Sequence, residues 1–212
     1  AQFTYSQSAE MIWFVALPSS VALCLIPLPI VSALFEHGET TRHDALAISS
    51  ATAIYGVGLP AFMIQKLLQP LYFAREDTKT PLRFALVSML LNAILAIGLL
   101  PIVGWIAVAI AASVSAWVTT ILLWISTKRF GQAAHVLKTS ISRIRGAFLG
   151  SLAMGIILWA VNQNFYVSME TSSERVFFAF GLIFLGATTY LVVVFVLKAF
   201  PRNLEKVYEK KN

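Results

Sequence analysis

The sequence predicts an all-α integral membrane protein, a polytopic bundle of about six transmembrane helices. Of its 212 residues, 58% are hydrophobic and only 12% are charged. A soluble domain of this length needs a much larger charged surface. Uncharged stretches of roughly twenty residues recur along the chain, long enough to cross a hydrocarbon core about 30 Å thick. These runs are too long for strands and do not alternate, so helices are expected throughout.

Six candidate spans follow one another, separated by short polar turns except for one longer basic segment. They are Met11–Phe35, Ala45–Phe73, Leu82–Val103, Trp105–Thr127, Gly146–Val167 and Val176–Phe200. We group residues 1–131 as one four-helix unit and treat 132–145 as a basic cytoplasmic linker. Residues 146–212 then form two C-terminal helices with a basic tail.

The Lys and Arg residues orient the bundle. If residues 1–10 face the cytoplasm, 14 of the 16 basic residues fall on that side, and only Arg42 and Arg175 do not. The excess of basic residues in cytoplasmic loops therefore predicts that both termini are cytoplasmic. Their position in short loops favours topology signals and contacts with membrane lipids over nucleic-acid binding. Because the chain starts at Ala1 rather than Met, we expect it to be part of a longer protein.

Prolines interrupt the first two spans. Pro18, Pro27 and Pro29 lie in the first span and Pro60 in the second. Each removes a backbone donor and clashes with the preceding turn, so these helices should kink or break. In transporters such breaks mark hinges or cavity walls. A static bend tolerated by packing is the alternative.

Few polar residues lie inside the spans, which makes them informative. Asn92 is central in the third span, and Gln65 and Lys66 lie toward the inner end of the second. These three are candidates for lining a cavity. The alternatives are an interhelical hydrogen bond for Asn92 and a snorkelling side chain for Lys66.

Small residues in the fifth span have the spacing of a helix-packing face. Gly146 and Gly150 form a GxxxG pattern, and Gly155 belongs to a second small stripe nearby. Such residues let helix backbones approach closely without any ligand.

No catalytic constellation is visible in the sequence. No span holds paired carboxylates, there is no His cluster, and no Ser-His-Asp arrangement lies in a water-accessible setting. His37 and His43 lie in an outer loop beside acidic residues, where a solvated loop is a stronger interpretation than a metal site. We therefore expect no enzyme activity, no cofactor and no metal.

One loop is the densest polar segment of the chain. It consists of Arg75, Glu76, Asp77, Thr78, Lys79, Thr80 and Pro81. Pro81 suits the first turn of the third span, with Thr80 as its N-cap. The charges can pair with one another or with a neighbouring cytoplasmic loop. A network that forms in one conformation and breaks in another would bias a cytoplasmic gate.

The run from Leu68 to Pro81, LQPLYFAREDTKTP, closely resembles a segment of the MurJ/MviN family of bacterial lipid II flippases. The segments Ala16–Ser19, Leu34–Gly38 and Ser113–Trp117 are similar too, so the resemblance covers roughly Ser6 to Gly131. Beyond Gly131 it rests on hydropathy and helix order. The family has fourteen transmembrane helices in two lobes and belongs to the multidrug/oligosaccharidyl-lipid/polysaccharide exporter superfamily. This chain resembles its last six helices.

The resemblance implies a lipid II flippase in the bacterial inner membrane, working by alternating access with the N-terminal lobe of the same protein. It implies that the last two helices, with Gly146, Gly150 and Gly155, form a groove for the polyprenyl tail. The family's cavity arginines precede this segment. Some relatives pair the asparagine at Asn92 with an acidic residue four positions later, whereas this chain has Ala96. The coupling ion therefore stays open.

Two other functions stay open from the residues alone. One is a polysaccharide-lipid or multidrug exporter of the same superfamily, although a drug exporter would often carry a carboxylate inside a span. The other is a non-transporting membrane scaffold that binds partners through Lys128–Arg145.

Overall fold

The computed structural model describes residues 2–36, 40–134, 136–165 and 172–201, and these residues are helical almost throughout. The elements are α1 (Gln2–Leu25), α2 (Pro27–Phe35), α3 (Arg42–Phe73), α4 (Lys79–Val103), α5 (Ile106–Thr127), a 3₁₀ segment η1 (Lys128–Ala134), α6 (Lys138–Phe165) and α7 (Ser172–Val196). All but α2 and η1 are long and apolar enough to cross a membrane. The prediction of an all-α bundle with six spans is confirmed.

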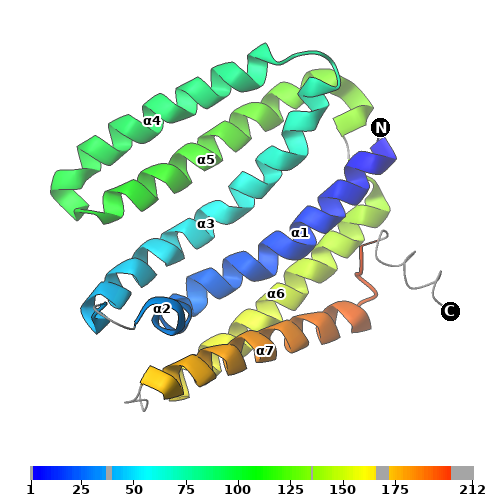
Figure 1. Cartoon of the computed structure of the whole chain (residues 1–212). Helices are drawn as coiled ribbons and strands as arrows, with labels where there is room; N and C mark the ends of the chain where they lie inside the picture. Colours follow the sequence, from blue (N-terminus) through cyan, green and yellow to red (C-terminus); the bar gives the residue numbers. More distant parts are fainter. Residues whose placement is uncertain (1, 37–39, 135, 166–171, 202–212) are drawn as a thin grey trace.

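The long helices form a single row rather than a closed bundle (Figure 1). Helix α4 packs on α5, α5 on α3, α3 on α1, α1 on α6, and α6 on α7. The short helix α2 contacts both α3 and α7. A row leaves two broad faces uncovered, and the exposed large side chains on them are apolar, as in Ile97, Phe177 and Phe184.

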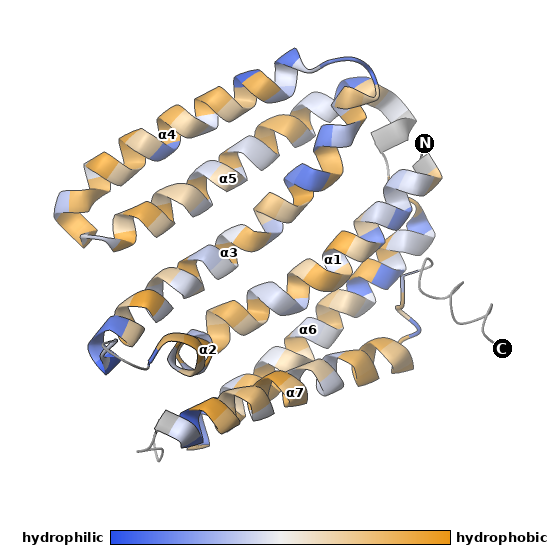
Figure 2. Cartoon of the chain, viewed as in Figure 1, coloured by the Kyte–Doolittle hydropathy of each residue, from blue (hydrophilic) through white to orange (hydrophobic). Residues whose placement is uncertain are grey.

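Charged residues gather near the ends of the long helices, and therefore along two opposite edges of the row. Figure 2 shows hydrophobic residues along the middle of the helices and hydrophilic residues toward their ends. We call one end the basic end: it holds the start of α1, the α3–α4 loop, η1, the start of α6 and the end of α7. The opposite end holds α2, the α4–α5 turn and the start of α7. The cytoplasmic orientation of the basic end stays a prediction.

The first predicted span, Met11–Phe35, is wrong in its bounds. Helix α1 begins at Gln2 and ends at Leu25. The helical conformation is interrupted at Ile26, where φ is −125° and ψ is 41°. Pro27 and Pro29 then occupy the first turn of α2, where a missing N–H breaks no helical bond. Pro18 lies inside α1 and Pro60 inside α3, so the expected break occurs at only one of these places.

The bounds around the last two spans also differ. Helix α6 begins at Lys138, so half of the predicted linker 132–145 is its first two turns. Helix α7 ends at Val196 instead of Phe200, because the chain turns through a left-handed residue, Lys198, at φ 49°. His37 and the basic residues 202–211, which the predictions above include, lie outside the described residues.

Helix α4 is the least covered span. No residue in its most apolar window is buried. Its partly buried positions, such as Phe84, Ser88 and Asn92, recur every four residues and form the face that packs on α5. The rest of its circumference is left to lipid or to protein outside this chain.

Candidate functional site

The signature loop is organised around Asp77 at the basic end. Its Oδ1 accepts a hydrogen bond of 3.0 Å from the Thr80 backbone N–H, and Arg129 from η1 forms an ion pair with its Oδ2. The backbone and hydroxyl of Thr80, and then Arg129, hold the pKa of the Asp77 carboxyl below its usual range. Arg129 also donates to the Thr80 hydroxyl at 3.2 Å. The charges thus pair with the neighbouring loop, one of the two predicted arrangements.

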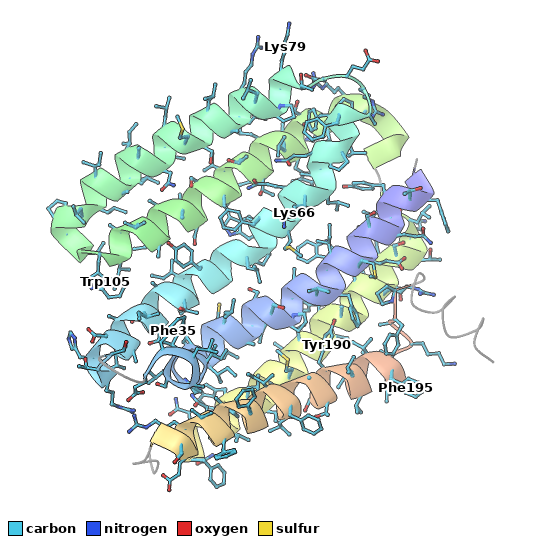
Figure 3. All side chains as sticks on the ribbon, in the orientation of Figure 1. Phe35, Lys66, Lys79, Trp105, Tyr190 and Phe195 are labelled. Atoms are coloured by element: carbon cyan, nitrogen blue, oxygen red, sulfur yellow. The ribbon has the colours of Figure 1, made fainter. Side chains whose placement is uncertain are left out.

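The predicted N-cap at Thr80 is wrong. Helix α4 already begins at Lys79, and Thr80 is a donor in its first turn. The side chain that caps this turn is Asp77, whose negative charge also suits a helix N-terminus. Pro81 does lie in the first turn, as expected. Lys79 points away from the bundle (Figure 3).

The loop leaves α3 through a tight C-terminal turn. The N–H of Asp77 donates to the Tyr72 carbonyl at 3.1 Å, and the N–H of Glu76 donates to the Phe73 carbonyl at 3.0 Å. This pair of bonds is a Schellman motif, which places Glu76 in the left-handed region at φ 58°. A glycine would adopt that conformation more easily, so the loop holds Glu76 under backbone strain.

Aromatic residues hold the two loops together beneath these charges. Tyr72 is fully buried and packs edge-on against Phe130, with ring centroids 4.9 Å apart. The guanidinium of Arg75 lies 4.2 Å from the Phe130 ring centre, and that of Arg129 lies 5.5 Å from Tyr72. Such cation–π contacts add to the Asp77 pair. The basic-end cluster therefore consists of Tyr72, Arg75, Asp77, Arg129 and Phe130.

Two of the predicted hinge prolines lie where helices are tied together. Pro18 has no N–H for the Phe14 carbonyl, and the Tyr190 hydroxyl of α7 donates to that carbonyl at 2.7 Å. Pro60 likewise leaves the Gly56 carbonyl free, and the Ser20 hydroxyl of α1 donates to it at 2.6 Å. Neighbouring helices thus satisfy the carbonyls that the prolines release. The hinge role stays a prediction, and these contacts favour a static bend.

The predicted cavity residues lie on different surfaces. Gln65 donates to the Ala116 carbonyl at 2.9 Å and to the Thr120 hydroxyl at 3.3 Å, so its amide joins α3 to α5. Asn92 is half-buried on the α5-facing side of α4. Lys66 is exposed on α3 (Figure 3). The three do not converge on one site within the described residues.

The predicted small residues of α6 lie at close helix contacts. A Cβ on Gly146 would overlap Ala199, and one on Gly150 would lie 3.1 Å from Tyr190. A Cβ on Gly155 would lie 2.9 Å from Val21 of α1. Gly146 and Gly150 therefore face the α7 side, and Gly155 faces α1.

Two open apolar grooves flank α1 in this region. One, of about 270 Å³, lies between α1 and α7 over Met154, with Pro18 and Tyr190 among its lining residues. The other, of about 410 Å³, lies between α1 and α6 and is lined by Ser20, Val21, Cys24, Leu25, Leu152, Gly155, Ile156 and Trp159. Both have the apolar character that an acyl or prenyl chain requires.

Sequence reasoning missed a buried carboxylate, Glu10. It lies inside the candidate span Phe3–Leu25 and is 3% exposed, whereas the predicted first span, Met11–Phe35, begins one residue after it. The Ser140 hydroxyl donates to its Oε1 at 2.6 Å, and Arg143 lies 4.0 Å from its Oε2. Arg143 also donates to the Phe200 carbonyl after α7. Residues 1–10 are expected to face the cytoplasm, and no local sequence pattern distinguishes a buried glutamate there from a solvated one.

A second missed group lies at the opposite end. Glu36, at the end of α2, forms ion pairs with Arg175 of α7 and with Arg42 of α3, the latter at 3.8 Å. Burial raises the pKa of Glu36, but hydrogen bonds from Ser32 and Arg175 outweigh it and leave the pKa below its usual range. These ion pairs therefore persist above the ordinary carboxyl range and are lost as the pH falls through the lowered value. Arg42 and Arg175 are the two basic residues that broke the charge asymmetry.

The part of the chain that the structure describes contains no group of three or more His, Cys, Asp or Glu side chains placed to hold a metal ion. Gln65, Asp77, Glu10 and Glu36 each join one helical element to another.

Comparison with known proteins gives one consistent family. The family model described as lipid II flippase MurJ matches residues 2–178. A probable lipid II flippase MurJ of Rhizobium tropici is 31% identical over 198 residues, which cover 91% of this chain and 36% of that protein. The corresponding protein of Vibrio cholerae is 30% identical over 206 residues, which cover 97% of this chain and 39% of that protein.

A solved structure gives the same result. "Lipid II flippase MurJ, inward closed conformation" superposes with a TM-score of 0.77 at 26% identity, over 96% of this chain and 40% of that one. The chain thus spans about two fifths of the length of the proteins it matches. The family match also continues well past Gly131, where the resemblance had rested on hydropathy alone.

Proposed function

Because the chain belongs to the MurJ family of lipid II flippases, we propose that it is the part of such a flippase that supplies its last six spans. It is a multi-pass protein of the bacterial inner membrane. The proposed activity moves lipid II, the lipid-linked peptidoglycan precursor, from the inner to the outer leaflet. The family match over residues 2–178 is the observation that carries this proposal.

The proposed role of α6 and α7 is to accommodate the polyprenyl tail. The grooves beside α1 support it, because they are apolar and open, and because the smaller is lined by both α6 and α7 and the larger by α6. Gly155 borders the larger groove, where the absence of a side chain lets α6 approach α1 closely.

The proposed role of the basic-end cluster is that of a cytoplasmic gate element. It joins the α3–α4 loop to η1 through the Asp77–Arg129 pair, which is partly exposed. An exposed pair of this kind contributes little stability and can break at low energetic cost. The same pair can therefore distinguish two conformations of the loop.

The alternatives gain little. A drug exporter would use an intramembrane carboxylate, but Glu10 is already bonded to Ser140 and close to Arg143. The scaffold hypothesis places partner binding on Lys128–Arg145, of which Arg129 and Arg143 already bond within the chain. We infer a transport role without catalysis.

Depletion of the full-length protein tests the proposal. In depleted cells, lipid II should stay inaccessible to a lipid II-cleaving enzyme added from the outside, and re-expression should restore cleavage. If lipid II remains equally accessible after depletion, the proposed function is wrong.

A further inference from the structure

Helices α6 and α7 are attached to α1 and α2 by charged groups at both ends of the row. At the basic end, Glu10 of α1 meets Ser140 and Arg143 of α6, and Arg143 continues to the Phe200 carbonyl beyond α7. At the opposite end, Glu36 of α2 meets Arg175 of α7. We call these the basic-end clasp and the opposite-end clasp.

Both clasps are shielded from solvent. The side chains of Glu10 and Arg143 are 1% and 20% exposed, and those of Glu36 and Arg175 are 11% and 13% exposed. Separating a pair of this kind leaves a buried charge without its partner, which is strongly unfavourable. The Asp77–Arg129 pair, by contrast, is 25% and 49% exposed.

Between the clasps, contacts hold the pair at mid-height. The Tyr190 hydroxyl donates a hydrogen bond to the Phe14 carbonyl that Pro18 leaves free. Phe14 and Tyr190 pack with ring centroids 5.3 Å apart, and Gly155 brings α6 against Val21. A helix pair held at both ends and in the middle cannot swing about any one of these points.

We propose that the two clasps make α6 and α7 a rigid extension of α1 and α2, so that the four helices move as one body. Glu10 and Glu36 are the positioning residues of this arrangement. The inference rests on the proposed function for its consequence: the two grooves keep their width throughout the transport cycle, and a bound chain moves with this body.

Cys24 provides a readout that needs no transport. Cys24 is one of the residues that line the larger groove between α1 and α6, and it is half-buried, with its thiol donating to the Ala53 carbonyl of α3 at 3.5 Å. In full-length protein in membranes, Glu10→Gln with Glu36→Gln should raise the rate of Cys24 alkylation by a membrane-permeant maleimide roughly tenfold. Glu76→Gln is the matched control, because it removes an exposed charge at the basic end. An unchanged rate in the double variant overturns the proposal.

A cross-link tests the rigid body directly and does not depend on the unclasped variant folding. Val21→Cys and Gly155→Cys, in a Cys24→Ser background, place two thiols where a Cβ on residue 155 lies 2.9 Å from a Val21 methyl. The oxidised full-length protein should expose lipid II at the outer leaflet as fast as the reduced protein does.

The outcomes separate the two proposals. If the disulfide forms and stops transport until it is reduced, α6 must move against α1 and the rigid body is wrong. If the reduced protein itself exposes no lipid II, the proposed function fails, and the alkylation result alone then decides whether the clasps hold the helices.

Discussion

In the α3–α5 interface, side chains of each helix donate to backbone carbonyls of the other along most of the contact. In the attachment of α6 and α7, charged groups act at the two ends, and the Tyr190–Phe14 hydrogen bond and apolar side chains lie between them. From α5, Ser113 donates to the Ile54 carbonyl, Trp117 to the Val57 carbonyl and Thr120 to the Ala61 carbonyl. From α3, Gln65 donates to the Ala116 carbonyl and Tyr72 to the Leu123 carbonyl. The two helices run in parallel, and each bond fixes their register.

The difference assigns different tasks to the two interfaces. In lipid, no water competes for the carbonyls, and polar side chains at close helix contacts fix one packing. The two grooves described above both lie beside α1 rather than between α3 and α5. Attachment by the ends leaves apolar space between the clasps. A rigid core thus lies beside a region suited to accept a chain.

The largest expected effect comes from a side chain placed between α3 and α5. A Cβ on Gly58 would lie 2.7 Å from the Ser113 hydroxyl and 3.1 Å from its Cα. Gly58→Leu should destabilise the full-length protein by about 3 kcal/mol or prevent folding, because backbone atoms cannot yield. Gly98→Leu on α4 is the control, since nothing lies within 4 Å of its Cβ position. Thermal unfolding in detergent measures both, and equal melting temperatures would show that α3–α5 packing is not tight.

A smaller loss should follow removal of one bond of the same interface. The Tyr72 hydroxyl donates to the Leu123 carbonyl at 2.6 Å in a fully buried setting. Tyr72→Phe should lower the unfolding free energy by about 1.5 kcal/mol. Tyr55→Phe, on an exposed position of the same helix, should have almost no effect. If both variants unfold alike, the α3–α5 bonds do not carry the stability assigned to them.

The sequence predicts those features that depend on neighbouring residues and misses those that depend on residues distant in the chain. The number of spans follows from composition, and the break in the predicted first span follows from its prolines; both are local properties of the sequence. The extent of α1 and α6 does not follow from local properties, because the polar side chains there find their partners only after the two helices meet. Ser6 accepts from the Leu137 N–H, and Glu10 bonds to Ser140 and lies close to Arg143. The donors to the carbonyls that Pro18 and Pro60 leave free are likewise distant in the chain. Tyr190, for example, lies 176 residues from Phe14. The loop from Arg75 to Pro81 was recognised as a motif, but its partner, Arg129, was not.

The α1–α7 contact allows a sharper test by double substitution. Tyr190→Phe should cost about 1 kcal/mol, since the Phe14 carbonyl then lacks a donor. In a Pro18→Ala background, the alanine N–H can reach that carbonyl and the cost should shrink toward zero. A double-mutant cycle on unfolding free energies measures the coupling. Strict additivity would mean that the hydroxyl and the proline do not share this acceptor.

The smallest effect is expected where the two regions are alike. Helix α3 ends with Glu76 at φ 58°, and α7 ends with Lys198 at φ 49° in the same pattern of bonds. Glycine relieves the strain of either position, by about 1 kcal/mol. A carboxylate is unfavourable at a helix C-terminus whereas an ammonium is favourable, so Glu76→Gly should stabilise more than Lys198→Gly. Glu76→Ala and Lys198→Ala remove the same charges but keep the Cβ, and they separate the two contributions. If Glu76→Ala raises the melting temperature as much as Glu76→Gly, charge rather than backbone strain limits the loop that joins α3 to α4.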